Sequence, residues 1–413
     1  MASTTPSSSG CGSTTWRAGS RRHGSANAGS IRSCSRTTTR ATSRCNGCRP
    51  PGGPAGRGRV KQVDDLVELH AALRARGCYR RPTGRVVAEL GLFLAIVAAA
   101  LAMLITLEGV AVHLAALLLL TLGSLGVAAN THTSSHYATS ERRWLNELLT
   151  YFGCSFFLQF SATYWWHKHG VHHRSPNVIG VDADVDFKPL FALDRDEVDR
   201  CSRRRRRYHR WQCVILPLAI ASNAINMQIA GWSHLIGALA RRATRRREHW
   251  IDLGAMALHW VVWILVPLSL FAPADVALFH LTRTVLLSYA FFAAFAPAHL
   301  PAEALFVRPA QGRGDFVLRQ TATTVNFRTG RIGRLLCAGL DYQIEHHLFP
   351  GLSHVHYADA SEVVRAYCER HGYPYRTLGW GEAIWKALLV FYRPKPVHRL
   401  EAAAGSARQA AIA

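Results

Sequence analysis

Residues 86–129 read VVAELGLFLAIVAAALAMLITLEGVAVHLAALLLLTLGSLGVAA and contain two long apolar segments, Val86–Leu107 and Val110–Ala129. Each segment is about long enough to cross a hydrocarbon core of roughly 30 Å as a helix. Only Glu108 and Gly109 separate them, so we expect a tight helical hairpin. This stretch predicts that the chain is a multi-pass integral membrane protein.

Two further apolar segments predict a second hairpin. The third span covers Leu253–Phe271, and a fourth lies within Val276–Pro297, where Arg283 interrupts the apolar run. Thr284–Pro297 alone would be short for a span, which makes the fourth span the least regular of the set. The expected fold class is an all-α integral membrane protein with four transmembrane helices in two hairpins.

Two apolar stretches between the hairpins carry too many polar side chains for spans. They are Trp144–Trp166, with Asn146, Glu147 and Gln159, and Trp211–Leu239, with Asn223, Asn226, Gln228 and His234. Such side chains are costly in lipid, so both stretches are expected to form interfacial or re-entrant helices. A fifth span at Trp211–Leu239 would also divide the histidine motifs described below between the two faces of the membrane.

The net charge of +23 comes largely from arginine. Residues 1–60 hold ten Arg and no Asp, Glu or Lys, and much of the remaining +13 lies in residues 203–207 and 241–247, beside apolar segments. Arginine beside apolar segments is typical of the cytoplasmic ends of membrane spans, where it can contact anionic lipid headgroups. Because no recognition-helix pattern accompanies the charge, nucleic acid is not an expected partner.

The two ends of the chain are polar. Residues 1–60 are rich in Ser, Thr, Gly and Arg, which predicts a disordered tail. The composition also suits an organellar transit peptide, and a start codon further downstream is a third explanation. Residues 381–413 are expected to form a C-terminal helix followed by a disordered tail.

Eight histidines fall into motifs that follow the predicted hairpins. They are His132 and His136 in HTSSH, His169, His172 and His173 in HGVHH, His299 after the fourth span, and His346 and His347 in QIEHH. On a helix, Gln343, His346 and His347 share one face. With two spans in each hairpin, all the motifs lie on the cytoplasmic side, where the arginine clusters are also expected.

The spacing of these histidines favours metal binding. Neutral imidazole is a metal ligand, and two residues one helical turn apart can direct two ring nitrogens at one ion. A histidine with a satisfied hydrogen bond would explain any single motif, but it explains eight residues poorly. The motifs supply too many ligands for one tetrahedral zinc and suit two metal ions, of which iron is the expected choice for oxygen chemistry.

The order His-x-x-x-His, His-x-x-His-His, Gln-x-x-His-His around two membrane hairpins resembles the membrane-bound fatty acid desaturase family. The resemblance extends to Trp165–His169, Pro176–Val178 and Gln320–Asn326, and it places the desaturase domain at residues 61–380. Gln343 at the head of the third motif is typical of the front-end branch. That branch introduces double bonds between an existing double bond and the carboxyl end.

The resemblance implies a di-iron enzyme that uses O2 to desaturate a fatty acyl chain in the membrane. The eight histidines would be the iron ligands, with Gln343 as a weak or water-mediated one. A metal-bound histidine usually donates its second ring N–H to an acceptor. The acidic candidates for that role are Asp182, Asp184, Asp186, Asp341 and Glu345. Electrons would come from a separate ferredoxin- or cytochrome-type protein with an NAD(P)H-dependent reductase.

Three departures from the family pattern stand out. Thr133 follows the first histidine where front-end relatives usually have Asp, and Asp341 stands where Asn is usual. Residues 49–53, RPPGG, lack the histidine of the fused cytochrome domain that many relatives carry. Two alternatives stay open: a related di-iron hydroxylase, and a non-catalytic histidine-rich metal-handling protein. A transporter of that second kind would usually place its polar residues inside the spans.

Overall fold

The structure is a computed structural model that describes residues 66–309 and 315–400 of the 413. The predicted disordered tail at 1–60 and the final part of the predicted C-terminal tail lie outside the described residues. Most of the described residues are helical, and the described part of the chain has only two small parallel sheets. These pair β1 (Phe306–Val307) with β4 (Val397–His398) and β2 (Asn326–Arg328) with β3 (Thr377–Gly379). The expected all-α fold class is therefore confirmed.

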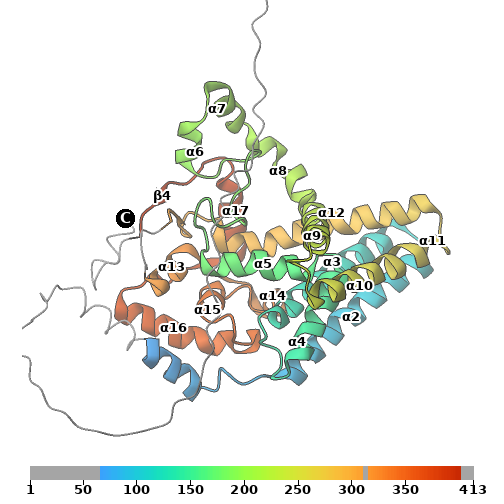
Figure 1. Ribbon diagram of the computed structural model, residues 1–413, viewed down its shortest axis with the longest axis horizontal. Helices are drawn as coiled ribbons and strands as arrows, with labels where there is room; N and C mark the ends of the chain where they lie inside the picture. The colour runs from blue at the N-terminus through green and yellow to red at the C-terminus, as the bar shows by residue number, and fades with distance from the viewer. Residues whose placement is uncertain (1–65, 310–314, 401–413) are drawn as a thin grey trace, which may run out of the picture. The chain divides into compact units, whose positions relative to one another are not determined.

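Four long apolar helical segments match the predicted spans. They are α2 (Thr83–Thr106), α3 (Val110–Ser135), Arg247–Leu268 and α12 (Pro273–His299). The third comprises α10 (Arg247–Trp260), the π-helix η2 (Val261–Leu265) and α11 (Val266–Leu268). In Figure 1 the four run beside one another toward the right of the view.

The first hairpin depends on glycine at two places. Gly109 has a φ of +105°, which L side chains rarely adopt, and it allows the chain to reverse directly between α2 and α3. At the helix contact, a Cβ atom added to Gly126 would lie 2.1 Å from Cδ1 of Phe93. Glycine at position 126 therefore lets the Phe93 ring pack against the backbone of α3.

The fourth span is continuous through Arg283, so the expected interruption is wrong. Arg283 is buried, its Nη2 donates to the carbonyl of Phe157 at 2.9 Å, and its guanidinium lies 4.4 Å from the ring centre of Trp263. These contacts replace part of the hydration that a buried arginine loses. The helix therefore accommodates the charge without ending.

Two of the spans extend beyond the C-terminal ends of their predicted apolar segments. α3 reaches Ser135 and α12 reaches His299, so His132 and His299 lie in the last turns of these helices. The sequence placed both histidines beyond the spans. The last turns of α3 and α12 thus position His132 and His299 close to the other histidine motifs.

The two polar-apolar stretches form broken helices. The first consists of α4 (Arg143–Thr150), the π-helix η1 (Tyr151–Phe157) and α5 (Ala162–Arg174). The second consists of α8 (Gln212–Ala221) and α9 (Asn223–Ala240), bent by 64°. This bend is the geometry of a broken span or of a re-entrant loop, and the polar composition favours the re-entrant arrangement.

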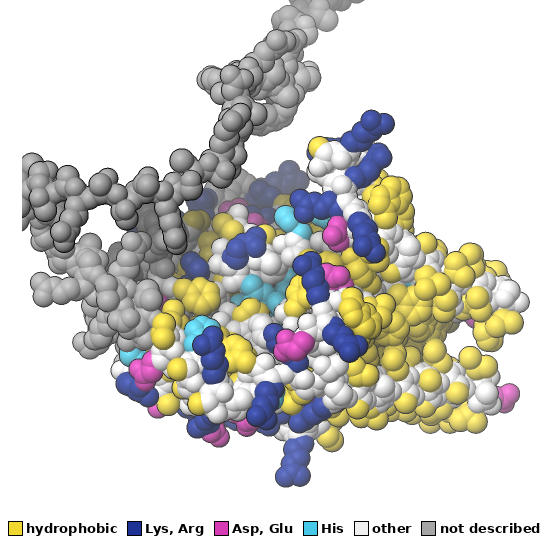
Figure 2. Space-filling view, turned by 60° about the horizontal axis from the view of Figure 1, so that its bottom comes forward, with side chains coloured by type: hydrophobic (Ala, Val, Ile, Leu, Met, Phe, Trp, Pro, Cys, Tyr) yellow, Lys and Arg dark blue, Asp and Glu magenta, His cyan; other side chains and the backbone are white. Residues whose placement is uncertain are grey.

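The remaining elements surround the cytoplasmic ends expected for the spans. They are α6 (Arg195–Arg200), α7 (Arg203–His209), α13 (Phe316–Thr323), α14 (Gly330–Cys337), α15 (Gln343–Leu348), the 3₁₀ turn η3 (His354–His356), α16 (Tyr357–His371) and α17 (Trp380–Leu389). Figure 2 shows apolar side chains gathered over the long helices, and charged side chains over the rest of the visible face. An exposed apolar surface of this extent is expected to face lipid.

Candidate metal centre

All eight predicted histidines converge in two groups. The five-histidine group consists of His132, His136, His169, His173 and His346, and the three-histidine group consists of His172, His299 and His347. Within each group, the candidate ligand nitrogens all lie within 4.8 Å of one another. Residues that span more than two hundred positions of sequence therefore meet at the ends of α3, α5, α12 and α15.

The five-histidine group centres on His169. Its Nε2 lies 2.8 Å from Nε2 of His132 and 3.0 Å from Nε2 of both His136 and His173. The Nε2 atom of His346 is buried and has no hydrogen-bond partner among the described residues. A neutral imidazole carries one N–H, so protons cannot satisfy all of these converging nitrogens. A shared cation would satisfy them, and this donor set fits a metal ion.

The three-histidine group is equally close. The ring centre of His172 lies 4.6 Å from that of His299 and 4.9 Å from that of His347. Nδ1 of His172 lies 2.8 Å from Oδ2 of Asp182, and Nδ1 of His347 lies 3.2 Å from Oε1 of Gln320. In His172 and His347 the Nδ1 atom is thus engaged, and Nε2 is the ring nitrogen that remains for a metal ion.

The doubled histidines are divided between the two groups. On α5, His169 and His173 are four residues apart and belong to the five-histidine group, while His172 belongs to the other. On α15, His346 and His347 are likewise separated. Adjacent helical residues differ by about 100° in direction, so each histidine pair faces two different centres.

Burial keeps five of the imidazoles outside the spans neutral. It lowers the pKa of His136 to about 3, with a smaller contribution from His172. Burial and the neighbouring imidazoles also lower the pKa of His169, His173, His346 and His347 well below 6.5. Neutral imidazole is the form that binds metal ions, so the centre is ready to bind at neutral pH.

Asp182 holds His172 most directly. Burial would raise the pKa of this carboxyl, but its electrostatic interaction and hydrogen bond with His172, together with the backbone N–H of Asn177, outweigh burial and lower it. The backbone N–H groups of Asn177 and Asp184 donate to Asp182 at 2.8 and 2.9 Å. The carboxylate is thus fixed as an acceptor for the Nδ1–H of His172.

The other four acidic candidates have different surroundings. Asp184 lies 3.5 Å from Nδ1 of His172 and also pairs with Lys168, whereas Asp186 pairs with Lys188. Asp341 accepts from Thr329, and Glu345 accepts from Asn326 and Tyr375. Burial raises the pKa of Asp341 to about 6 and that of Glu345 to about 7. Of the five acidic candidates, only Asp182 and Asp184 contact one of the eight imidazoles through a described hydrogen bond or ion pair.

Two partners of the centre were not singled out in the sequence. Gln320 contacts His347 through Oε1, and its Nε2 donates to the carbonyl of His173 at 2.9 Å. The hydroxyl of Tyr357 lies 3.0 Å from Nδ1 of His346. Gln320 opens a segment that carries the family resemblance, which is a usable signal, whereas nothing near Tyr357 in the sequence marks it.

Gln343 and His354 also lie close to the histidine groups. Gln343 is buried, and its Oε1 has no hydrogen-bond partner among the described residues, so that oxygen is free to accept from a water or to face a cation. Nδ1 of His354 lies 2.7 Å from Oγ1 of Thr133, and its Nε2 lies 2.8 Å from Oε2 of Glu89. His354 therefore joins neighbouring elements and belongs to neither group.

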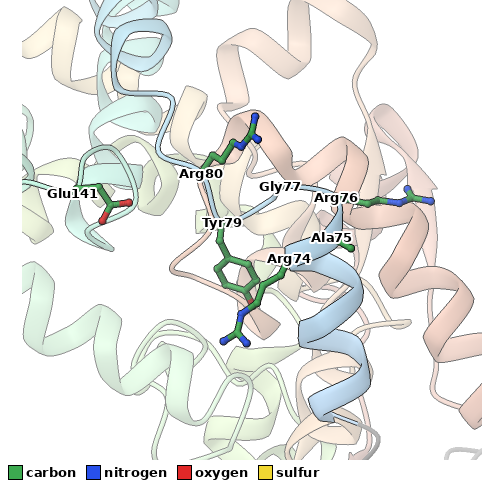
Figure 3. A pocket seen from close by; sticks show the side chains of 7 residues that line it. All are labelled: Arg74, Ala75, Arg76, Gly77, Tyr79, Arg80 and Glu141. Atoms are coloured by element: carbon green, nitrogen blue, oxygen red, sulfur yellow. The ribbon is translucent and has the colours of Figure 1, made fainter.

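Two surface cavities lie apart from the centre. One of about 520 Å³ is lined by residues 74–77, Tyr79, Arg80 and Glu141, and in Figure 3 Arg74 lies beside Tyr79 with Glu141 across from them. A second, of about 390 Å³, is lined by Arg81, Tyr137, Ser140, Glu141, Arg143 and Asn146. None of the eight histidines lines either cavity, which agrees with their burial.

Comparison with known proteins identifies the family. The family model for fatty acid desaturases matches residues 108–379. The chain is 26% identical to human fatty acid desaturase 3 over 249 residues, which cover 59% of this chain and 53% of that protein. It is 29% identical to the Delta(8)-fatty-acid desaturase of Euglena gracilis over 259 residues, which cover 60% and 59%. It is 26% identical to a Delta(5) fatty acid desaturase of Caenorhabditis elegans over 270 residues, which cover 62% and 57%.

The chain thus spans between half and three-fifths of the length of these relatives. Delta-5, delta-6 and delta-8 desaturases are all among its homologues, and they confirm the front-end resemblance indicated by Gln343. The family match covers well over half of the chain and includes all eight histidines. The chain therefore belongs to the fatty acid desaturase family.

Proposed function

We propose that the chain is a di-iron, O2-dependent desaturase that introduces a double bond into a fatty acyl chain, in the front-end position. The convergence of eight histidines in two buried groups is the observation that carries this proposal. The names of the delta-5, delta-6 and delta-8 relatives support the front-end position.

Each histidine group would hold one iron ion, with Gln343 as a weak or water-mediated ligand. Such an iron pair would supply the oxidising chemistry: with two electrons and two protons from outside the site, O2 and two hydrogens from adjacent acyl carbons would give one double bond and two water molecules. No amino-acid side chain is a strong enough oxidant for an unactivated methylene group. The protein's own task is to present neutral ligands in a dry, fixed geometry.

Three residues carry out that task at the Nδ1 atoms of the ligands. Asp182 accepts the Nδ1–H of His172, Gln320 does so for His347, and the hydroxyl of Tyr357 faces Nδ1 of His346. The hydrogen bonds to Asp182 and Gln320 select the tautomer in which Nε2 has a lone pair, and all three contacts restrain the rotation of their rings.

The arginine clusters support an orientation in which both histidine groups face the cytoplasm. An external ferredoxin- or cytochrome-type protein, supplied by an NAD(P)H-dependent reductase, would deliver the electrons there. The substrate would be a long unsaturated acyl chain carried on coenzyme A or on a membrane lipid, and it would reach the centre from the membrane.

Product analysis tests this function. The full chain would be expressed in cells fed with unsaturated fatty acids, and the lipids would be analysed by gas chromatography and mass spectrometry. The expected product has one new double bond on the carboxyl side of an existing one. A hydroxylated product without a new double bond would instead support the hydroxylase alternative. Purified protein without about two irons per chain would contradict the di-iron proposal.

A further inference from the structure

A carboxylate with no ionic partner among the described residues lies inside the third span. Asp252 of α10 is fully buried, and each of its oxygens accepts several hydrogen bonds. The donors are Oγ of Ser155 (2.6 Å), Oγ of Ser161 (2.6 Å), N of Ala162 (3.1 Å), and N and Oγ1 of Thr163 (2.9 and 2.6 Å). A carboxylate in an apolar layer is costly unless its lone pairs are satisfied in this way.

Most of these donors belong to the first turn of α5. The N–H groups of Ala162 and Thr163 have no acceptor within their own helix, because the first turn of any helix leaves such groups free. The next N–H, that of Tyr164, donates to Oγ of Ser161 at 3.1 Å. Asp252 thus places a negative charge at the positive end of the α5 dipole and joins η1 to α5 through Ser155.

The anchored helix carries three of the eight histidines. From Thr163 to His169 is six residues, or about 9 Å along a helix axis. Over that distance the ring of Trp165 stacks on His169 with centres 4.3 Å apart, and Nε1 of Trp166 donates to the carbonyl of Ser135 at 3.0 Å. A change at Asp252 would therefore move the α5 ligands together.

The α5 terminus also packs against α9. A Cβ atom added to Gly231 would lie 3.0 Å from N and 3.1 Å from Cβ of Ser161. The start of α5 is consequently in contact both with the Asp252 carboxylate and with the backbone of α9. Loss of the carboxylate leaves its donors unsatisfied and leaves α5 free to shift toward α10.

We propose that Asp252 is a positioning residue of the metal centre, and that its carboxylate sets the axial position and rotation of α5. The inference rests on the proposed metal-binding function. Asp252 acts through the helix and touches neither histidine group. Its loss is therefore expected to change metal affinity and ligand geometry in addition to protein stability.

The test uses the full chain, purified in detergent and stripped of metal by a chelator. Co²⁺ would be titrated into the wild type and into Asp252→Ala, Asp252→Asn and Thr163→Val, with affinity and ligand geometry followed by the visible absorption of the ion. Ser288→Ala is the matched control, because Oγ of Ser288 is a buried acceptor in a neighbouring span and bonds to N of Ala224. Melting temperatures would be measured on the same samples.

We expect Asp252→Ala to bind Co²⁺ at least tenfold more weakly than wild type, with an altered spectrum. The Co²⁺ affinities of Asp252→Asn and Thr163→Val should lie between those of Asp252→Ala and wild type, and that of Ser288→Ala should equal the wild-type value. If Asp252→Ala does not fold, the other two variants carry the comparison. Wild-type affinity and spectrum in the Asp252 and Thr163 variants, with only a lower melting temperature, would overturn the inference. A wild-type protein that binds no metal would instead refute the proposed function.

Discussion

Replacing Asp182 by asparagine should weaken metal binding at the three-histidine group and leave the five-histidine group filled. The carboxylate of Asp182 contacts His172 at 2.8 Å, and His172 belongs only to the smaller group. Asparagine keeps the size of the side chain but has one acceptor oxygen in place of two. The experiment therefore measures the contribution of the negative charge and the second acceptor oxygen of Asp182 to metal binding.

The expected magnitude follows from the hydrogen bonds of Asp182. One oxygen accepts from His172 and from N of Asn177, and the other accepts from N of Asp184. In Asp182→Asn, the amide oxygen can keep the first two bonds, although they lose their charge-assisted strength. Removing a residue that orients a metal ligand typically costs 10- to 100-fold in affinity, or about 1.4–2.8 kcal/mol. We expect a loss of about tenfold for asparagine and about a hundredfold for alanine.

The assay is iron content per purified chain, together with a two-phase Co²⁺ titration that resolves the tighter and the weaker site. The variant should retain about one metal ion and lose the other at a limiting free metal concentration. Asp186→Asn is the control, since Asp186 belongs to the same acidic segment and pairs with Lys188. Equal losses in the two variants, or an equal loss from both histidine groups, would refute the assigned role of Asp182.

Three further predictions concern stability. Lys395→Met should lower the free energy of unfolding by about 3 kcal/mol, because the buried Nζ donates to three carbonyls at and beyond the end of α12. Lys386→Met is the control, because its side chain is partly exposed, and it should change the free energy of unfolding by less than about 1 kcal/mol. Chemical denaturation measures both variants. Equal losses would contradict the explanation by burial. Gly126→Val should lower the melting temperature and weaken the first hairpin by about 1–3 kcal/mol, since its side chain would overlap Phe93. An unchanged melting temperature would show that α2 and α3 can separate without cost. Chelator-treated protein should become less stable as the pH falls below 6.5 and continue to do so toward about 3, because the depressed pKa of His136 favours the unfolded state on acidification. Thermal melting across this range measures the slope, and a stability that rises on acidification would contradict the burial of neutral imidazoles.

The four spans and the metal-ligand candidates could be predicted because each depends on local spacing. Apolar length predicted the helices, and histidine spacing predicted that the motifs would face a common centre. The continuity of α12 could not be predicted in this way, since Arg283 is accommodated by Phe157, more than a hundred residues away. The contact between Tyr357 and His346 likewise depends on how α15 and α16 pack.

The sequence also did not predict which histidines belong to which of the two groups. Helical spacing indicates which residues share a face, but the two centres lie where four helices meet. Among the acidic candidates, proximity to a histidine motif in the sequence did not predict a contact with an imidazole. Glu345 is adjacent to His346 yet bonds to Asn326 and Tyr375, because neighbouring helical side chains point in different directions.

The shared use of α5 and α15 constrains how this sequence can vary in length. Inserting one residue between His169 and His172 would turn the following imidazoles by about 100° relative to the preceding one. Both centres would then lose a ligand in a single event, and no substitution elsewhere could restore the spacing. These two helices should therefore tolerate substitutions at outward positions but neither insertions nor deletions, and a library that varies segment lengths should leave them intact.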